Sequence, residues 1–172
     1  MDSSIRKAEP EGGLAGLLGR CMVNLRLRST AREEILRELL RPLSEAGSVE
    51  EEETVLQALL ERENQASTGV GRGVAIPHVE ERAVTMSCLS IGVAKRGVDF
   101  GSLDSKPTDL FFLFLFPKGY TGQRMKIVAQ VMGLMRKREV REAIRRSADA
   151  EGLRETFLRH LGSDRSLLRG TN

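Results

Sequence analysis

The stretch DLFFLFLF, residues 109–116, decides the fold class. It is flanked by Pro107 and Pro117, and all but its first residue are apolar. A strand with one face in water alternates apolar and polar residues, whereas an unbroken apolar run indicates a strand covered on both faces. We therefore predict a central β-strand here, with helices packed on either side. The run is far shorter than the ~20 apolar residues that a membrane-spanning helix requires, so no membrane insertion is expected.

Helical and strand patterns surround this strand. We predict further strands at 21–27, 74–76 and 87–95. Apolar residues at helical spacing predict two helices between residues 30 and 60, and others at 14–18, 122–135, 138–147 and 149–160. This interleaving predicts an α/β fold, a single three-layer domain in which helices flank a mixed central β-sheet. We place the domain at residues 14–160, with flexible tails at 1–13 and 161–172.

Two helix starts have residues suited to capping. Thr30 and Glu33 have the spacing of a capping box, in which a hydroxyl and a carboxylate bond the first backbone amides of a helix. Gly47 is expected to end that helix. Ser48 is predicted to cap the next one, where the four glutamates at 50–53 suit the positive end of the helix dipole.

The charge balance is mildly basic. The chain has 27 Lys and Arg against 24 Asp and Glu, a formal net charge of +3. The two kinds of charge are mixed along the chain, so no nucleic-acid partner is expected. In the segment 136–146, six basic side chains are interrupted by Glu139 and Glu142. We interpret this segment as a solvated helix face, and docking of an acidic partner or a phosphate group there stays open.

The cysteines and the N-terminus indicate where the protein acts. Cys21 and Cys88 stand far apart and outside any CxxC motif, which favours reduced thiols. The first 13 residues are polar and contain no apolar core of a signal peptide. We therefore expect a cytoplasmic protein.

The most informative segment is glycine-rich and leads into the sequence Ala-Ile-Pro-His at 75–78. Alternate glycines at 69, 71 and 73 predict an irregular loop, because they disfavour both helix and strand. They also let successive backbone amides converge as a nest for an anion. Pro77 holds the neighbouring backbone extended and stiff. A histidine beside such a nest can attack a phosphoryl group and hold the product, which makes His78 the candidate nucleophile.

Other site chemistries fail on spacing. A lone histidine is more often structural than catalytic, and we interpret His160, in an arginine-rich terminal helix, in that way. GVGRG is not the GxGxxG fingerprint of dinucleotide binding, and the chain has no GK[ST] of a P-loop. No second nearby histidine or cysteine pair completes a zinc site, so neither a metal nor an organic cofactor is expected. Ser67 lacks the pattern of a nucleophile elbow.

The residues Arg62 and Glu63, followed by STGVGRGVAIPH at 67–78, resemble the active-site motif RE…STGIGNGIAIPH of a known family. This is the fructose/mannitol-type enzyme IIA (EIIA type 2) family of the bacterial phosphotransferase system. The resemblance extends over residues 14–160, through the VNL segment before the motif and the apolar strand after it. The free-standing nitrogen-regulatory branch of the family is closest in layout.

The resemblance implies a phosphorelay step, in which a histidine phosphocarrier protein donates a phosphoryl group to a ring nitrogen of His78. Attack requires a neutral imidazole, whose other nitrogen should donate to a backbone carbonyl. The resemblance further implies that the phosphoryl group is bound by six residues: Arg62, Ser67, Thr68, Gly69, Gly71 and Arg124. The carrier needs a shallow apolar surface around His78, to which we assign Val70, Val74 and Val79.

Two positions depart from the family pattern. Arg72 replaces the usual Asn of the motif, and Arg124 stands where many members carry a second histidine. Arginine cannot shuttle a proton near neutral pH, but it can bind a phosphate bidentately. These changes favour a regulatory role, exerted through target proteins, over a sugar-transport EIIA that passes phosphate to an EIIB partner. A third interpretation is a binding module of the same fold that is never phosphorylated.

Overall fold

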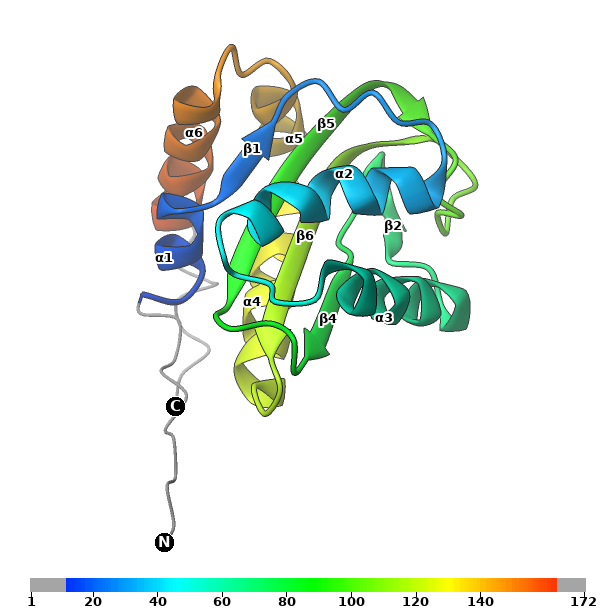
Figure 1. Ribbon diagram of the computed structural model, residues 1–172. Helices are drawn as coiled ribbons and strands as arrows, with labels where there is room; N and C mark the ends of the chain where they lie inside the picture. Colours follow the sequence, from blue (N-terminus) through cyan, green and yellow to red (C-terminus); the bar gives the residue numbers. More distant parts are fainter. Residues whose placement is uncertain (1–11, 164–172) are drawn as a thin grey trace, which may run out of the picture.

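The computed structural model describes residues 12–163, which form one domain of helices and strands (Figure 1). Helices α2 and α3 cover one face of the sheet, and the remaining helices cover the other (Figure 1). In chain order the elements are α1 (Gly13–Gly19), β1 (Met22–Asn24), α2 (Arg32–Glu45), α3 (Glu52–Gln65), β2 (Gly69–Gly71), β3 (Val74–Ala75), β4 (His78–Glu81), β5 (Cys88–Val98), β6 (Thr108–Pro117), α4 (Thr121–Met135), α5 (Arg138–Arg145) and α6 (Ala150–Ser163).

Strand β6 is the centre of a six-stranded mixed sheet, in which the main strand order is β1-β5-β6-β3-β2 and β4 also pairs with β6. β5 lies antiparallel to β6 on one side, whereas β3 and β4 lie parallel to it on the other. β1 is parallel to β5, and β2 is antiparallel to β3. The prediction of a central strand at 109–116 within a mixed sheet is confirmed.

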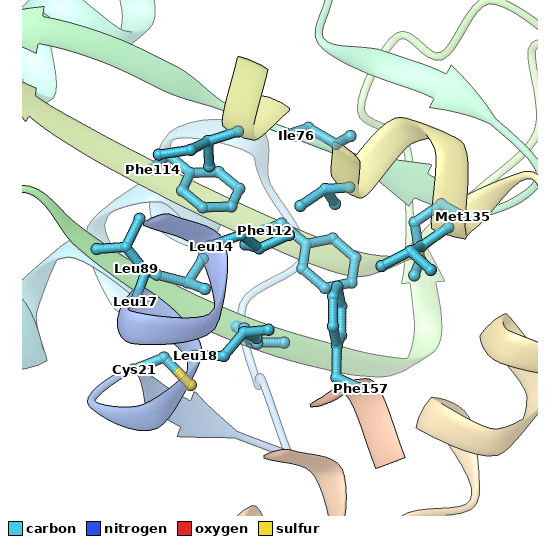
Figure 2. Packing of buried hydrophobic residues seen from close by; sticks show 14 of the residues in the cluster. Leu14, Leu17, Leu18, Cys21, Ile76, Leu89, Phe112, Phe114, Met135 and Phe157 are labelled. Atoms are coloured by element: carbon cyan, nitrogen blue, oxygen red, sulfur yellow. The ribbon is translucent and has the colours of Figure 1, made fainter. Parts of the chain in front are cut away.

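Successive side chains of β6 point into two different cores, because strand side chains alternate between faces. The residues from Leu110 to Phe116 are all fully buried. The even-numbered ones pack with α1, α4, α5 and α6. Figure 2 shows Phe112 and Phe114 in this core, with Leu14 and Phe157 from the flanking helices. The odd-numbered ones pack with α2 and α3. This double burial accounts for the unbroken apolar run and confirms the three-layer fold.

Helix α6 continues beyond residue 160, where the domain was expected to end. Leu153, Phe157 and Leu161 recur at helical spacing, and all three are buried. The Phe157 ring packs edge-on against that of Phe112, with 5.7 Å between the ring centroids. Residues 161–163 therefore belong to α6, and Gly13 of the predicted N-terminal tail belongs to α1. The parts of the predicted tails at 1–11 and 164–172 lie outside the described residues.

The predicted capping box at the start of α2 is wrong. The helix begins at Arg32, its N-cap is Ala31, and no side chain bonds the cap amides. Thr30 is exposed. The loop before the helix is organised by Glu38, whose carboxylate accepts both the amide and the hydroxyl hydrogen of Ser29. A tertiary contact thus replaces the local cap that the spacing suggested.

The predicted cap at Ser48 is also wrong. Helix α3 begins at Glu52, with Glu51 as its N-cap. Val49 forms an isolated antiparallel bridge with Val84, and this pairing keeps the backbone extended past Ser48. The helix can therefore begin only after the bridge.

Within residues 12–163, no helix has both the length and the apolar character needed to cross a membrane. The same part of the chain has no group of three or more His, Cys, Asp or Glu side chains that could hold a metal ion. Cys21 and Cys88 are free and buried. Burial raises the pKa of the Cys88 thiol to about 12, so this side chain is not a nucleophile at neutral pH.

Candidate functional site around His78

His78 is the first residue of β4, a strand that the sequence analysis did not predict. β3 ends at Ala75, and Pro77, which has no N–H group, separates the two strands. The Phe114 amide donates to the Pro77 carbonyl at 2.9 Å, and His78 itself pairs with Phe114. The backbone of His78 is therefore anchored on the central strand of the sheet.

One nitrogen of the imidazole is fixed by the backbone. His78 Nδ1 lies 2.8 Å from the Ile76 carbonyl oxygen. Because a carbonyl oxygen can only accept, this contact assigns the ring hydrogen to Nδ1 and leaves the lone pair on Nε2. The predicted contact with a backbone carbonyl is confirmed.

The surroundings of the ring also keep it neutral. Burial, joined by the positive charges of Arg62 and Arg124, lowers the pKa of His78 below its usual value of 6.5. The hydrogen bond to Ile76 acts in the opposite direction and is outweighed. The imidazole is therefore in its neutral, nucleophilic form at neutral pH.

A cavity of about 550 Å³ opens beside the imidazole. Its walls come from α3, β4 and α4, together with Lys118 from the segment before α4: Arg62, His78, Val79, Glu80, Lys118, Arg124, Met125, Val128 and Met132. The structure thus brings Arg62 and Arg124, two of the expected phosphate ligands, to the same cavity as His78. Val79 is the predicted apolar contributor that lines it, whereas Val70 and Val74 line a neighbouring cavity.

Arg124 is held in the cavity by Glu80, a residue that the sequence analysis missed. The guanidinium Nη1 lies 3.6 Å from Glu80 Oε2, and the Glu80 side chain is only 8% exposed. The other carboxylate oxygen accepts the Gly119 amide hydrogen at 2.6 Å. Since residues i and i+2 of a strand share a face, the spacing from His78 would have indicated Glu80 had β4 been predicted. Arg124 Nε is buried and has no hydrogen-bond partner among the described residues.

The glycine-rich segment forms a hairpin, not the irregular loop that we predicted. β2 pairs with β3, and a register shift lies between Gly69 and Gly71. The turn itself has positive φ angles at Gly71, Arg72 and Gly73, of 87°, 58° and 78°. Glycine adopts these angles at little cost, and the shift absorbs the extra residue, so strand pairing survives the alternate glycines.

The expected anion nest is occupied by groups of the protein itself. The Gly69 amide donates to Ser67 Oγ, and the Gly71 amide donates to Ser102 Oγ, both at 3.1 Å. The Ser67 hydroxyl in turn donates to the Phe100 carbonyl at 3.0 Å. None of Ser67, Gly69 and Gly71 is among the residues that line the His78 cavity. In this conformation these groups shape the hairpin.

Thr68 is tied to the buried carboxylate of Glu63 at the end of α3. The Thr68 amide donates to Glu63 Oε2 at 3.0 Å, and the Thr68 hydroxyl contacts Glu63 Oε1. The Thr68 carbonyl accepts the Ile76 amide hydrogen at 3.0 Å. Glu63 therefore connects α3, through Thr68, to the strand that leads into His78. Glu63 of the motif, to which the sequence pattern assigned no role, is therefore a buried structural contact.

The family model of the phosphoenolpyruvate-dependent sugar phosphotransferase system, EIIA 2, matches residues 17–160. The chain belongs to this family. The fructose-specific EIIABC component of Bacillus subtilis is 28% identical over 144 residues, which are 84% of this chain but only 23% of that longer EIIABC protein. The nitrogen regulatory protein of Bradyrhizobium diazoefficiens is 32% identical over 127 residues, or 74% of this chain and 82% of that protein.

Solved structures of EIIA proteins share the fold. The nitrogen regulatory protein IIA-Ntr from Neisseria meningitidis aligns with a TM-score of 0.74 at 26% identity, over 83% of this chain and 93% of that one. Mannitol IIA from Escherichia coli, solved in complex with phosphorylated mannitol IIB, aligns with a TM-score of 0.68 at 19% identity. That alignment covers 79% of this chain and 93% of that one. The resemblance to the EIIA type 2 family is thus confirmed.

Proposed function

We propose that this EIIA type 2 protein accepts a phosphoryl group on His78 Nε2 from a histidine phosphocarrier protein, and that its phosphorylation state regulates target proteins. The observation that carries the proposal is the 2.8 Å contact between Nδ1 and the Ile76 carbonyl oxygen. This contact occupies one ring nitrogen and leaves the other with its lone pair beside the cavity. A neutral ring with a free lone pair is the form that nucleophilic attack requires.

The transfer balances without any proton changing place. The lone pair of His78 Nε2 forms the new N–P bond, while the N–P bond of the carrier's phosphohistidine breaks. The carrier ring, protonated on its other nitrogen, leaves as a neutral imidazole. Because Nδ1 of His78 keeps its hydrogen, the phosphorylated ring is cationic and is stabilised by the Ile76 carbonyl. A cationic ring is a good leaving group, so the phosphoryl group can later be passed on or hydrolysed.

Arg62 and Arg124 serve both the acceptor and the product. Their charges help to keep the free imidazole neutral. After transfer, the same charges neutralise the phosphoryl oxygens in a partly buried site, where electrostatic interactions are stronger than in water. Arg62 Nη1 donates to the Ala66 carbonyl at 2.9 Å, which fixes that guanidinium near the cavity. We propose weaker roles for Ser67, Thr68, Gly69 and Gly71, which would contact a phosphoryl group only after the hairpin shifts.

Two observations favour regulation. Arg124 cannot exchange a proton near neutral pH, unlike the second histidine of many family members. The chain also matches most of the length of a free-standing nitrogen regulatory protein. The second candidate is a sugar-transport EIIA that donates to an EIIB partner, which the similarity to a fructose-specific component supports. Phosphorylation by a carrier protein that depends on phosphoenolpyruvate would also require this protein to act in the cytoplasm, the location that we expected from its sequence.

Incubation with phosphoenolpyruvate, enzyme I and the carrier protein tests the proposal. Intact mass spectrometry should show one added phosphoryl group on the native protein and on His160→Ala, the matched control, but none on His78→Ala. Subsequent addition of an EIIB protein should leave the phosphoryl group in place, whereas its transfer would favour the sugar-transport role. If the native protein takes up no phosphoryl group, the only interpretation that remains is a binding module of the same fold that is never phosphorylated.

A further inference from the structure

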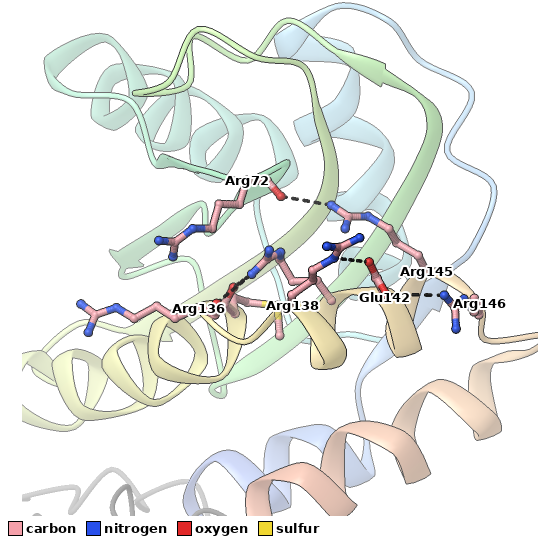
Figure 3. Close-up of polar contacts among 8 residues, drawn as sticks. Arg72, Arg136, Arg138, Glu142, Arg145 and Arg146 are labelled. Atoms are coloured by element: carbon pink, nitrogen blue, oxygen red, sulfur yellow. Dashed lines mark hydrogen bonds and ion pairs between the residues drawn. The ribbon is translucent and has the colours of Figure 1, made fainter.

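Six arginines gather on one face next to the His78 cavity, and we call this the arginine face. They come from the turn between β2 and β3, from the end of α4 and from α5 (Figure 3). Segments far apart in the chain thus contribute to one surface: Arg72, Arg136, Arg138, Arg141, Arg145 and Arg146.

The protein's own carboxylates neutralise only part of this charge. Glu142 is shared by Arg138, at 2.6 Å, and Arg146, at 3.4 Å (Figure 3). Asp109 holds Arg145 at 2.7 Å. Two carboxylates therefore serve three of the six guanidinium groups, and the face keeps a net positive charge.

Arg72 and Arg136 are exposed, and among the described residues neither guanidinium has an ion-pair partner. The backbone of Arg72 is nevertheless fixed on both sides. Its amide donates to Asp104 Oδ2 at 2.9 Å, and its carbonyl accepts Arg145 Nη2 at 3.1 Å. An ordered turn thus presents a free positive charge, at the position where the family motif usually has Asn.

Arg141 shows how crowded the positive charges are. Its Nη1 donates to the carbonyls of Met135 and Arg136, at 2.6 and 3.0 Å, so its hydrogen bonds bring no negative charge to the face. Burial, joined by the charges of Arg145 and Arg72, lowers the pKa of Arg141. An anionic ligand would relieve this repulsion.

An apolar cavity lies between the two unpaired arginines. It has a volume of about 170 Å³, and its lining includes Val70, Leu103, Met132 and Met135, with Arg72 and Arg136 also among its lining residues. This is close to the ~150 Å³ of a cavity that holds one benzene molecule. The Leu103 side chain is 80% exposed, although removing a leucine side chain from water is favourable in free energy. The cavity can therefore take one apolar side chain between two cations.

We propose that the arginine face binds an acidic segment of a partner protein, which places one apolar side chain in the cavity and its carboxylates on Arg72 and Arg136. A protein segment fits better than a nucleic acid. Apart from Arg72 and Arg136, the cavity is lined by aliphatic and thioether side chains, and none of its lining residues among those described carries an aromatic ring on which a base could stack.

This binding does not rest on phosphoryl transfer, because none of the six arginines is among the residues that line the His78 cavity. The two sites are nevertheless neighbours, since Met132 lines both cavities. A partner seated on the arginine face would lie at the edge of the His78 cavity. The test can therefore use the unphosphorylated protein, and the variant His78→Ala should bind equally well.

A fluorescent peptide in which Asp and Glu flank a single Leu provides the probe, and its binding is measured by anisotropy. The test variant is Arg72→Asn/Arg136→Gln, because Asn tolerates the left-handed turn and neither guanidinium supports the fold. The matched control, Arg26→Gln/Arg96→Gln, removes the same charge from exposed positions outside the arginine face. Leu103→Ser tests the cavity separately.

The native protein should bind the peptide, and the test variant should bind it about fivefold or more weakly, as expected for two exposed charge contacts. Leu103→Ser, and a peptide with Gly in place of Leu, should also weaken binding, whereas the control should not. Equal weakening by the control would overturn the proposal in favour of non-specific attraction. Tighter binding of a single-stranded oligonucleotide of equal charge, lost in the same test variant, would overturn it in favour of a nucleic acid.

Discussion

Removing the Glu63 carboxylate tests how the segment that leads into His78 is held. Glu63 is 3% exposed and Thr68 is 5% exposed, so both partners of this contact are out of water. In Glu63→Ala, the Thr68 amide and hydroxyl lose their acceptor inside the protein. Each buried group left without a partner costs about 1–3 kcal/mol, so the free energy of unfolding should fall by about 2–6 kcal/mol. That is a large share of the ~5–15 kcal/mol that stabilises a typical domain.

Urea denaturation followed by circular dichroism measures this loss. Glu61→Ala is the matched control, because Glu61 is exposed on the same helix, and its effect should stay within ~0.5 kcal/mol. Glu63→Gln keeps the shape and one acceptor, so it should lose less than Glu63→Ala and remain measurable if the alanine variant fails to fold. An effect of Glu63→Ala no larger than that of the control would refute the role of Glu63 in holding the hairpin.

Two further predictions concern the site and the core. NMR titration of the ring signals should give His78 a pKa below 6.5. Arg124→Gln should raise this pKa, because the variant removes one of the cations that lower it. An unchanged pKa in the variant would show that the charge of Arg124 does not reach the ring. Because the pKa is lowered in the folded state, the contribution of His78 to stability should be fully present above pH 6.5 and be lost as the pH falls through the folded value. Phe157→Ala should cost about 3–5 kcal/mol in urea denaturation, since the ring is fully buried against β6. Leu158→Ala, an exposed neighbour on the same helix, should cost less than ~1 kcal/mol, and similar losses for the two would contradict the placement of α6.

The central strand of the sheet could be predicted from the sequence, but the short elements at the edges of the fold could not. The run 109–116 predicted β6 correctly, because double burial leaves an unbroken apolar pattern that few other structures produce. Short elements have no such pattern. β4 has four residues, and its pairing with β6 is set by the tertiary fold rather than by local preference. The starts of α2 and α3 were misplaced for the same reason, since Glu38 and the pairing of Val49 are contacts at a distance.

The candidate site was predictable where one local contact decides the chemistry. Ile76 and His78 are only two positions apart in the chain, and their contact fixes the tautomer that we expected. The partners of the glycine-rich amides were not predictable, because Ser102 lies 31 residues beyond Gly71 in the chain. The same holds for the pairing of Glu80 with Arg124, which needs both β4 and α4 in place. Motif residues that suggested a phosphate nest therefore serve first to build the hairpin.

The most direct measurement is the position of the phosphoryl group on the ring of His78. The protein, labelled with ¹⁵N in its histidines and phosphorylated by its carrier, can be studied by heteronuclear NMR. We expect phosphorus on Nε2 and a hydrogen on Nδ1, still bonded to the Ile76 carbonyl. Phosphorus on Nδ1, or on any other residue, would contradict the central claim that this backbone contact selects the reactive nitrogen.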